Sequence, residues 1–216
     1  HSRVAIVAGG RFRVSEAVRI PRPNVALIVA EDATLEVARG AKLAAVSEGH
    51  GKYWPLIHNQ GRDNVAIINL GTLRASPQGG TCIMFNGRSG GELGISGGLI
   101  FSSGTLAQCG DAVWLVDSKD LQVPFAGAVS YDNNLMAIEG CEDVEIDTVA
   151  GLAGDRAGEN ETIDLNSYSR RIRIRQMIGT SRSEQVLDVN NSTDVMVDEI
   201  VGYTGGEAFR DELLSI

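Results

Sequence analysis

The segments IDLN at residues 163–166 and LDVN at residues 187–190 decide the fold of this chain. Each is a short apolar run that leads, through a polar turn, to a second apolar run beginning at Ile172 or Val195. The same pattern recurs earlier, so that the second runs are anchored at positions 65, 93, 121, 144, 172 and 195. The steps between these anchors are 28, 28, 23, 28 and 23 residues, and a strand-rich period of this length is typical of a β-solenoid.

Shorter apolar runs at the start of the chain predict strands as well. We expect these strands at residues 4–8, 11–14, 17–20, 25–30 and 34–37. Variable segments between the runs are expected to collect on one face and form the walls of a groove. They are residues 40–54, 75–80, 97–110, 125–134, 152–161 and 178–184. The helical spacing of EAFRDELL (207–214) predicts a C-terminal cap over residues 207–216, and residues 1–216 are expected to form one domain.

Alternation within the second run of each repeat predicts which side chains face the core. In the run IRIR (172–175) the isoleucines point inward and the arginines point outward. Stacking neighbouring repeats gives two expected contacts, Glu145 beside Arg173 and Arg175 between Asp147 and Asp198. Such pairs stabilise a sheet by about 0.2–1 kcal/mol each. We therefore expect a structural ladder here, with substrate binding by the arginines as the alternative.

Charge is spread unevenly along the chain, whose formal net charge is -9. Residues 1–120 carry 12 Lys/Arg and 10 Asp/Glu, a balance of +2, whereas residues 121–216 carry 7 Lys/Arg and 18 Asp/Glu, a balance of -11. A polyanion would be repelled by the second half and would settle on the first. The chain lacks the basic stripe of a nucleic-acid binder and an apolar stretch of about 20 residues, so neither nucleic acid nor membrane is an expected partner. Cys82, Cys109 and Cys141 have no metal-type spacing and form no disulfide framework.

The N-terminal runs resemble those of a known superfamily. Residues 10–14 (GRFRV), 17–21 (AVRIP), 25–28 (VALI) and 33–35 (ATL), with 53–57 (YWPLI) and 64–67 (NVAI) after them, look like the first coils of pectate-lyase-like proteins. The resemblance implies an all-β fold, a right-handed single-stranded parallel β-helix of about seven to eight coils. This superfamily contains polysaccharide lyases, uronan epimerases, glycoside hydrolases and phage tailspikes, so the fold alone does not give the function. The Asp-Asp and Gly-His-Gly motifs of polygalacturonases and the Tyr-Asp-Pro-His motif of mannuronan epimerases are missing.

The outward positions of the first run in each repeat form a predicted column along the solenoid. In order, it contains His58, Met84, Leu115 with Asp117, Ala137 with Glu139, Asp164 and Asp188. The resemblance implies a polysaccharide lyase that cleaves an acidic, alginate-type polyuronate by β-elimination. That reaction needs a group that neutralises the C5 carboxylate, a base for the C5 proton and an acid for the leaving oxygen. The expected catalytic residues are Lys119 as the base, Arg88, His58 and Tyr53, and the expected substrate-binding residues are Asn86, Lys52, His50, Asp117, Glu139 and Asp164.

Two other functions stay open at this point. The carboxylates of Asp117, Glu139, Asp164 and Asp188 suit glycoside hydrolysis, because neighbouring coils lie about 4.8 Å apart. Carboxylates on neighbouring coils would lie near the retaining distance of about 5–5.5 Å, and those two coils apart would lie nearer the inverting distance of about 6.5–9.5 Å. The missing motifs instead favour a non-catalytic, glycan-binding or tailspike-like solenoid, in which Lys119 is a turn lysine and the asparagines cap turns.

The expected partners and cofactors follow from the same resemblance. The lyase chemistry requires no cofactor, and Ca²⁺ is the ion that the oxygen atoms of the acidic column would accept. We expect an acidic polysaccharide as the partner and a secreted or periplasmic location. A homo-oligomer is compatible with the trimers known in the superfamily.

Overall fold

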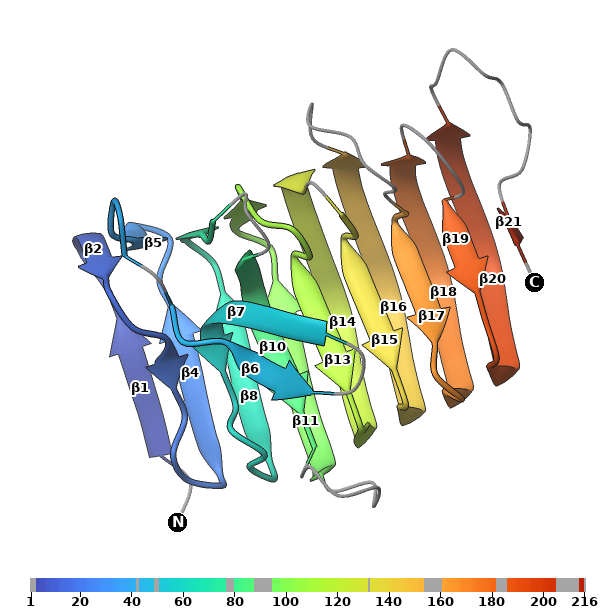
Figure 1. Ribbon diagram of the computed structural model, residues 1–216, viewed down its shortest axis with the longest axis horizontal. Helices are drawn as coiled ribbons and strands as arrows, with labels where there is room; N and C mark the ends of the chain where they lie inside the picture. The colour runs from blue at the N-terminus through green and yellow to red at the C-terminus, as the bar shows by residue number, and fades with distance from the viewer. Residues whose placement is uncertain are drawn as a thin grey trace.

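The computed structural model describes residues 3–41, 43–48, 51–76, 80–87, 95–131, 133–153, 161–181, 186–204 and 214–215. All regular structure in this part of the chain is β-strand. The strands stack in chain order along one long axis, from β1 near the N-terminus to β20 and β21 near the C-terminus (Figure 1). Neighbouring strands are parallel, except that β6 pairs antiparallel with β7. The fold is therefore the predicted all-β parallel β-helix.

The described residues form three sheets that wall the solenoid. The eight-stranded sheet contains β1 (Arg3–Val7), β4 (Val25–Val29), β8 (Val65–Asn69), β11 (Ile95–Ser102), β14 (Ser118–Tyr131), β16 (Glu142–Ala153), β18 (Arg170–Ser181) and β20 (Thr193–Thr204). The nine-stranded sheet contains β3 (Val18–Arg19), β6 (Val46–Glu48), β7 (Gly51–His58), β10 (Gly80–Asn86), β13 (Val113–Val116), β15 (Met136–Glu139), β17 (Ile163–Asn166), β19 (Leu187–Val189) and β21 (Leu214–Ser215). The four-stranded sheet contains β2 (Gly10–Val14), β5 (Ala33–Val37), β9 (Thr72–Arg74) and β12 (Thr105–Ala107).

The five strands predicted before residue 40 are confirmed as β1 to β5, with ends that differ by one or two residues. The predicted C-terminal cap lies outside the described residues, apart from β21, which pairs with β19 and continues the nine-stranded sheet. Among the described residues no helix is long and apolar enough to span a bilayer.

A left-handed backbone position precedes the core-facing part of the strands in the eight-stranded sheet. Positive φ angles between 50° and 78° are found at Asn24, Asn64, Gly97, Asp120, Asp143, Arg171 and Asp194. These positions stack on one another, because the residues that follow them are in register from Val25 to Val195. Asn, Asp and Gly adopt this conformation at least cost, which explains why polar-then-apolar pairs recur in the sequence. Arg171 is the exception in the series.

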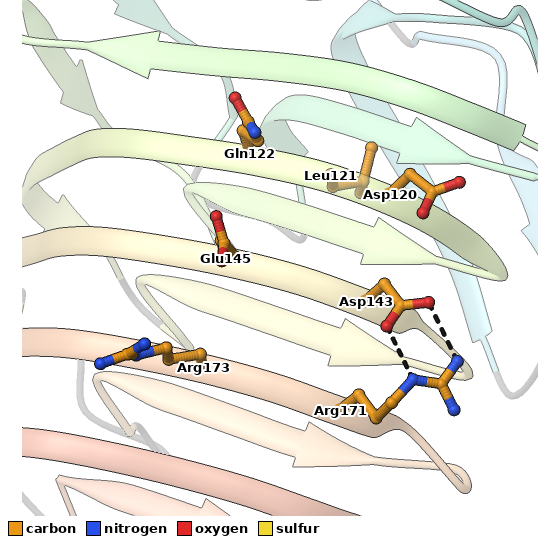
Figure 2. A pocket seen from close by; sticks show the side chains of 7 residues that line it. All are labelled: Asp120, Leu121, Gln122, Asp143, Glu145, Arg171 and Arg173. Atoms are coloured by element: carbon orange, nitrogen blue, oxygen red, sulfur yellow. Dashed lines mark hydrogen bonds and ion pairs between the residues drawn. The ribbon is translucent and has the colours of Figure 1, made fainter.

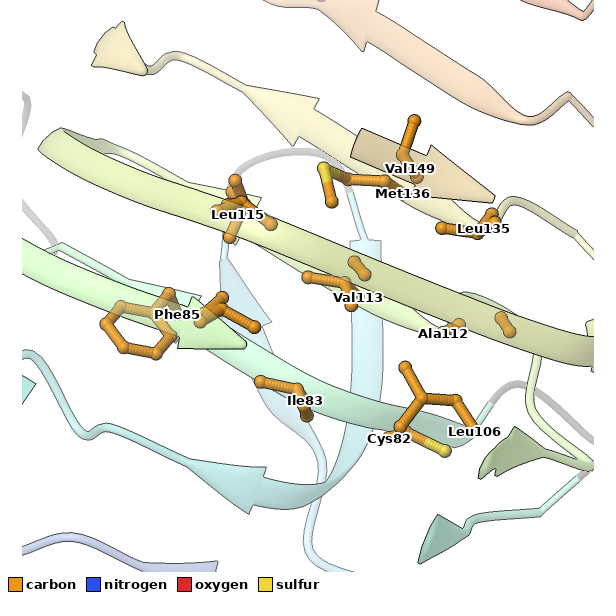
Figure 3. Close-up of a cluster of buried hydrophobic side chains, with 14 of the residues drawn as sticks. Cys82, Ile83, Phe85, Leu106, Ala112, Val113, Leu115, Leu135, Met136 and Val149 are labelled. Carbon is orange, nitrogen blue, oxygen red and sulfur yellow. The ribbon is translucent and has the colours of Figure 1, made fainter. Parts of the chain in front are cut away.

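Inward-facing side chains of successive coils build one continuous hydrophobic core. Figure 3 shows part of it, where Ile83, Val113 and Met136 from three neighbouring strands are aligned in register. Phe85, Leu115, Ile138 and Leu165 are aligned in register and fully buried. Full burial of one such side chain stabilises the fold by about 1.5–3 kcal/mol. The stack therefore holds the outward positions of the same strands in fixed order.

One predicted anchor was wrong. Gly98, and not Leu93, is in register with Val65 and Leu121, and Leu93 lies outside the described residues. A side chain has no room at this position, because a Cβ on Gly98 would lie 2.6 Å from Leu121 Cδ2 and 2.8 Å from Phe85 Cε1. The phenyl ring of Phe85 fills the core in place of the missing side chain. A search for apolar anchors cannot find a position that glycine occupies.

Candidate active site on the outward face of the nine-stranded sheet

The outward face of the nine-stranded sheet carries an uninterrupted column of side chains. We call it the outer column, and it contains Arg19, His58, Met84, Trp114, Ala137, Asp164 and Asp188. A second column lies two residues further along each strand and contains Asn86, Val116, Glu139 and Asn166. The sequence predicted Leu115 at the β13 position of the outer column, and that was wrong. Leu115 faces the core and Trp114 faces outward, because the run VWLV is apolar at every position and its alternation gives no register.

The middle of this face is apolar and closed to solvent. Met84, Trp114, Val116 and Ala137 form their own cluster and are 0–3% exposed. In the view of Figure 1 the β6–β7 pair passes over β10 and β13. The outward face is thus not one open groove, and its two ends have separate environments.

At the N-terminal end of the face, His58 and Asn86 form a buried polar pair. The distance from His58 Nε2 to Asn86 Oδ1 is 2.7 Å, and the two residues are 7% and 5% exposed. Asn59 fixes Asn86 by accepting a bond from its backbone N–H at 2.9 Å. Burial lowers the pKa of His58, and the charge of Arg19 on the neighbouring strand lowers it further, against the opposing effect of the bond to Asn86. The imidazole is therefore held in its neutral form near pH 7.

At the C-terminal end, Asp164 and Asp188 are direct neighbours on β17 and β19. Each carboxylate accepts a hydrogen bond from a side-chain amide two residues further along the chain. Asn166 Nδ2 lies 3.0 Å from Asp164 Oδ2, and Asn190 Nδ2 lies 2.5 Å from Asp188 Oδ2. Both carboxylates are half-buried, so they remain accessible from solvent.

The pKa values of both carboxyl groups in this pair are raised. The pKa of Asp164 is raised to about 6, mainly because burial removes water from the carboxylate and next because Asp188 is negatively charged. Burial also raises the pKa of Asp188, although hydrogen bonds from the Val189 backbone and the Asn190 side chain oppose the effect. One member of the pair can thus hold a proton at mildly acidic pH while the other is ionised.

A further buried carboxylate lies near the pair, and it was not among the residues predicted from the sequence. Asp111 is 5% exposed and accepts hydrogen bonds from Asn133 Nδ2 at 2.7 Å and from the Asn134 backbone at 3.3 Å. Burial raises the pKa of Asp111, and the charge of Asp111 contributes to the raised pKa of Asp164. The sequence offered one signal that could have indicated Asp111: a polar residue lies just before a strand there, as it does at Asn134 and Glu161.

The other predicted site residues are placed as follows. Lys119 lies half-buried on β14 of the eight-stranded sheet, in register with Ser96 and Glu142, and so outside the outer column. Asp117 is a turn residue with a φ of 47°. Glu139 is buried at 6% exposure in the second column, next to Asn166.

Four predicted residues cannot be placed in the site by their side chains. Arg88 and His50 lie outside the described residues. Lys52 and Tyr53 belong to β7, and the structure describes the backbone but not the side chain of each. Their roles stay predictions.

The outward face of the eight-stranded sheet has a different character. It holds a pocket of about 420 Å³ lined by Asp120, Leu121, Gln122, Asp143, Glu145, Arg171 and Arg173 (Figure 2). Arg171 Nε and one guanidinium nitrogen bind the two oxygens of Asp143 at 2.7 and 2.9 Å.

The predicted ladder surrounds this pocket. Glu145 is in register with Arg173, and Arg175 lies 3.1 Å from Asp147, as expected. Asp198 pairs with Arg173 at 3.1 Å rather than with Arg175. The arginines here are held by carboxylates, which favours the structural interpretation of the run.

In the described part of the chain, no three His, Cys, Asp or Glu residues are grouped closely enough to hold a metal ion. The predicted Ca²⁺ site therefore stays a prediction.

No protein-family model and no curated protein matches the chain. Among solved structures, it aligns with a candidate glycosyl hydrolase from Parabacteroides merdae at 12% sequence identity. The alignment covers 92% of this chain and 82% of that chain, with a TM-score of 0.43. A likeness at this level assigns no residue and no activity to the present chain.

Proposed function

We propose that the protein is a carbohydrate-active solenoid that hydrolyses glycosidic bonds with Asp164 and Asp188. One observation carries the proposal: two half-buried carboxylates lie side by side on adjacent parallel strands, in the accessible part of the outer column. Parallel strands are about 4.8 Å apart, which is close to the spacing of about 5–5.5 Å between the carboxyl groups of retaining glycosidases.

The different surroundings of the two groups suggest their roles. Asp164 has the pKa raised to about 6 and is the better general acid, so it would donate its proton to the glycosidic oxygen. Asp188 would attack the anomeric carbon as a carboxylate while the bond to the leaving sugar breaks. In the second step the ionised Asp164 would take a proton from water, and the resulting hydroxyl would release the sugar from Asp188.

The test is the release of reducing ends from a panel of polysaccharides. Asp164→Asn and Asp188→Asn should each lower the rate by at least about 100-fold, since each removes a group that acts in the reaction. The wild-type rate should fall as the pH rises above about 6, because Asp164 then loses its proton. Glu145→Gln, the same change of charge on the other sheet, is the matched control and should leave the rate unchanged. Full activity in both aspartate variants would rule out this site.

The buried His58–Asn86 pair favours a second candidate function, the β-elimination of a polyuronate. A neutral imidazole can act as the base, and Asn86 and Arg19 are suited to binding the C5 carboxylate. Because His58 and Asn86 are nearly inaccessible, a substrate would reach them only after the covering residues move. Lys119 lies on the eight-stranded sheet, so His58 takes its place as the proposed base, and the roles of Arg88 and Tyr53 stay predictions.

The two chemistries leave different products. A lyase produces a C4–C5 double bond, which absorbs ultraviolet light, whereas a hydrolase produces reducing ends without this absorbance. An absorbance rise on polyuronates that is lost in His58→Ala would establish the lyase. If no glycan yields any product, the remaining function is that of a non-catalytic, glycan-binding solenoid.

A further inference from the structure

Two further acidic residues lie around the Asp164–Asp188 pair in the part of the chain that the structure describes, whereas Ala137 and Ser215, the residues in register with the pair on either side, are uncharged. Glu139 lies one strand before the pair in the second column, and Asp111 lies close enough for its charge to act on Asp164. The ion pairs recorded among the described residues belong to other side chains, and none includes Asp111, Asp164 or Asp188. The partners of Asp164 and Asp188 are instead the neutral amides of Asn166 and Asn190.

The outer column carries its positive charge at the opposite end. Its N-terminal end carries Arg19 and the neutral His58, and an apolar buried cluster separates them from Asp164. His58 and Asp164 are four strand steps apart, a distance of about 19 Å, which is beyond the Debye length of about 8–10 Å at physiological ionic strength. Arg19 therefore does not offset the negative charge at the carboxylate pair.

From this distribution we infer that the pair acts on glycans whose sugar at the cleavage point carries no carboxylate, with neutral and amino sugars accepted and uronates rejected. The inference rests on the hydrolase proposed above and names its substrate class. A uronate bound here would bring its carboxylate within about 5 Å of an ionised aspartate, in a partly buried site where charges are weakly screened. Repulsion of this size weakens binding by about tenfold or more. The ammonium group of an amino sugar would be attracted by the same groups.

The experiment compares oligosaccharides of one backbone whose charge is changed by a single small substituent. Suitable matched sets are oligogalacturonides with and without methyl esters, and chitin oligosaccharides with and without their acetyl groups. Dissociation constants are measured for the wild-type protein and for the double variant Asp164→Asn, Asp188→Asn, which keeps the size of both side chains. Circular dichroism confirms that the variant is folded.

For the wild-type protein we expect affinity to fall about tenfold or more from the ester to the free uronate, and to rise when acetyl groups are removed. In the double variant both differences should shrink to about twofold, whereas Glu145→Gln should keep them. Added salt should narrow the wild-type differences. Equal wild-type affinity for ester and free uronate would overturn the inference, as would uronate cleavage that Asp164→Asn abolishes.

The ranking of the measured affinities distinguishes a failure of this inference from a failure of the proposed function. If the expected order is found but no glycan yields reducing ends, the substrate class stands and the hydrolase proposal fails. If neutral and uronate oligosaccharides are both hydrolysed at the pair, the hydrolase stands and the inference fails. If no oligosaccharide binds, both fail.

Discussion

The outward faces of the two large sheets differ in the side chains they carry and in their exposure to solvent. On β16, β18 and β20 charged side chains alternate with core residues, lie in solvent and pair with one another, as Arg175 does with Asp147. On β10, β13 and β15 the outer-column residues Met84, Trp114 and Ala137 are apolar and as buried as the core. In the outer column carboxylates appear only at Asp164 and Asp188, where no cation balances them among the described ion pairs.

The difference indicates which face is specialised. A ladder of exposed ion pairs contributes little to stability and needs no ligand to satisfy it. Half-buried carboxylates without a cation raise the free energy of the folded state in their ionised form, and such groups cluster at functional sites. The contrast can be tested at three positions, taken from the largest expected effect to the smallest.

Trp114→Ala should have the largest effect on stability. The indole is fully buried on the outward face, and removing it leaves a cavity that costs about 3–5 kcal/mol of unfolding free energy. Guanidinium denaturation followed by circular dichroism measures the loss. Met196→Ala is the control, because Met196 faces outward on β20 with 56% exposure and should change stability by less than about 0.5 kcal/mol. Similar small losses in both variants would mean that the two faces are equally open.

The same contrast explains how far the sequence could predict the fold. On β16 and β18 the outward residues are charged and the inward ones are branched apolar residues, so a register such as Glu145 beside Arg173 was predicted correctly. The left-handed positions were visible as Asp and Asn before the apolar anchors. Periodicity and turn chemistry are therefore together sufficient to predict the parallel β-helix.

Where both faces are apolar, the sequence could not predict the register. Strands buried on both sides carry continuous apolar runs, and in VWLV a shift of one residue exchanges Trp114 with Leu115 without breaking any pattern. The anchor position at Gly98 was missed because glycine contributes no apolar side chain to the pattern. In the candidate site, the neighbouring Asp164 and Asp188 could be predicted from the repeat, but the burial of His58 and the proximity of Asp111 depend on packing between coils.

Asp164→Asn should have an intermediate effect that depends on pH. Because the pKa of Asp164 is raised to about 6 in the folded state, its contribution is most favourable below the unfolded pKa and is lost as the pH rises through about 6. The variant should therefore be more stable than the wild type at pH 7, on the order of 1 kcal/mol given the partial exposure of the group, and equal to it near pH 4. Thermal unfolding at both pH values measures the difference.

Glu36→Gln is the opposite case and serves as the control. Hydrogen bonds and ion pairs from Arg11 and Arg13 lower the pKa of Glu36 to about 2. Its contribution is present above the unfolded pKa and is lost as the pH falls toward 2, so this variant should be less stable than the wild type at pH 7. If both variants changed stability in the same direction at pH 7, the charges at Asp164 would be balanced by a group that the described ion pairs do not include.

Arg171→Asn should have the smallest effect, because two contributions oppose each other. Arginine at a φ of 54° is strained by about 1 kcal/mol, and asparagine, found at the equivalent Asn24 and Asn64, relieves that strain. The substitution also removes the exposed ion pairs with Asp143 and Glu142, which are worth about 0–1 kcal/mol. We expect a net change within about 0.5 kcal/mol by urea denaturation at low salt. In 1 M salt the variant should become the more stable protein, because salt screens the ion pairs and leaves the backbone strain unchanged. Asp143→Asn is the control, because it removes an ion pair without relieving backbone strain. Its unfolding free energy should be slightly below that of the wild type at low salt and equal to it in 1 M salt, but not above it. A loss well above 1 kcal/mol in Arg171→Asn, unaffected by salt, would show that Arg171 is held for more than its place in the ladder.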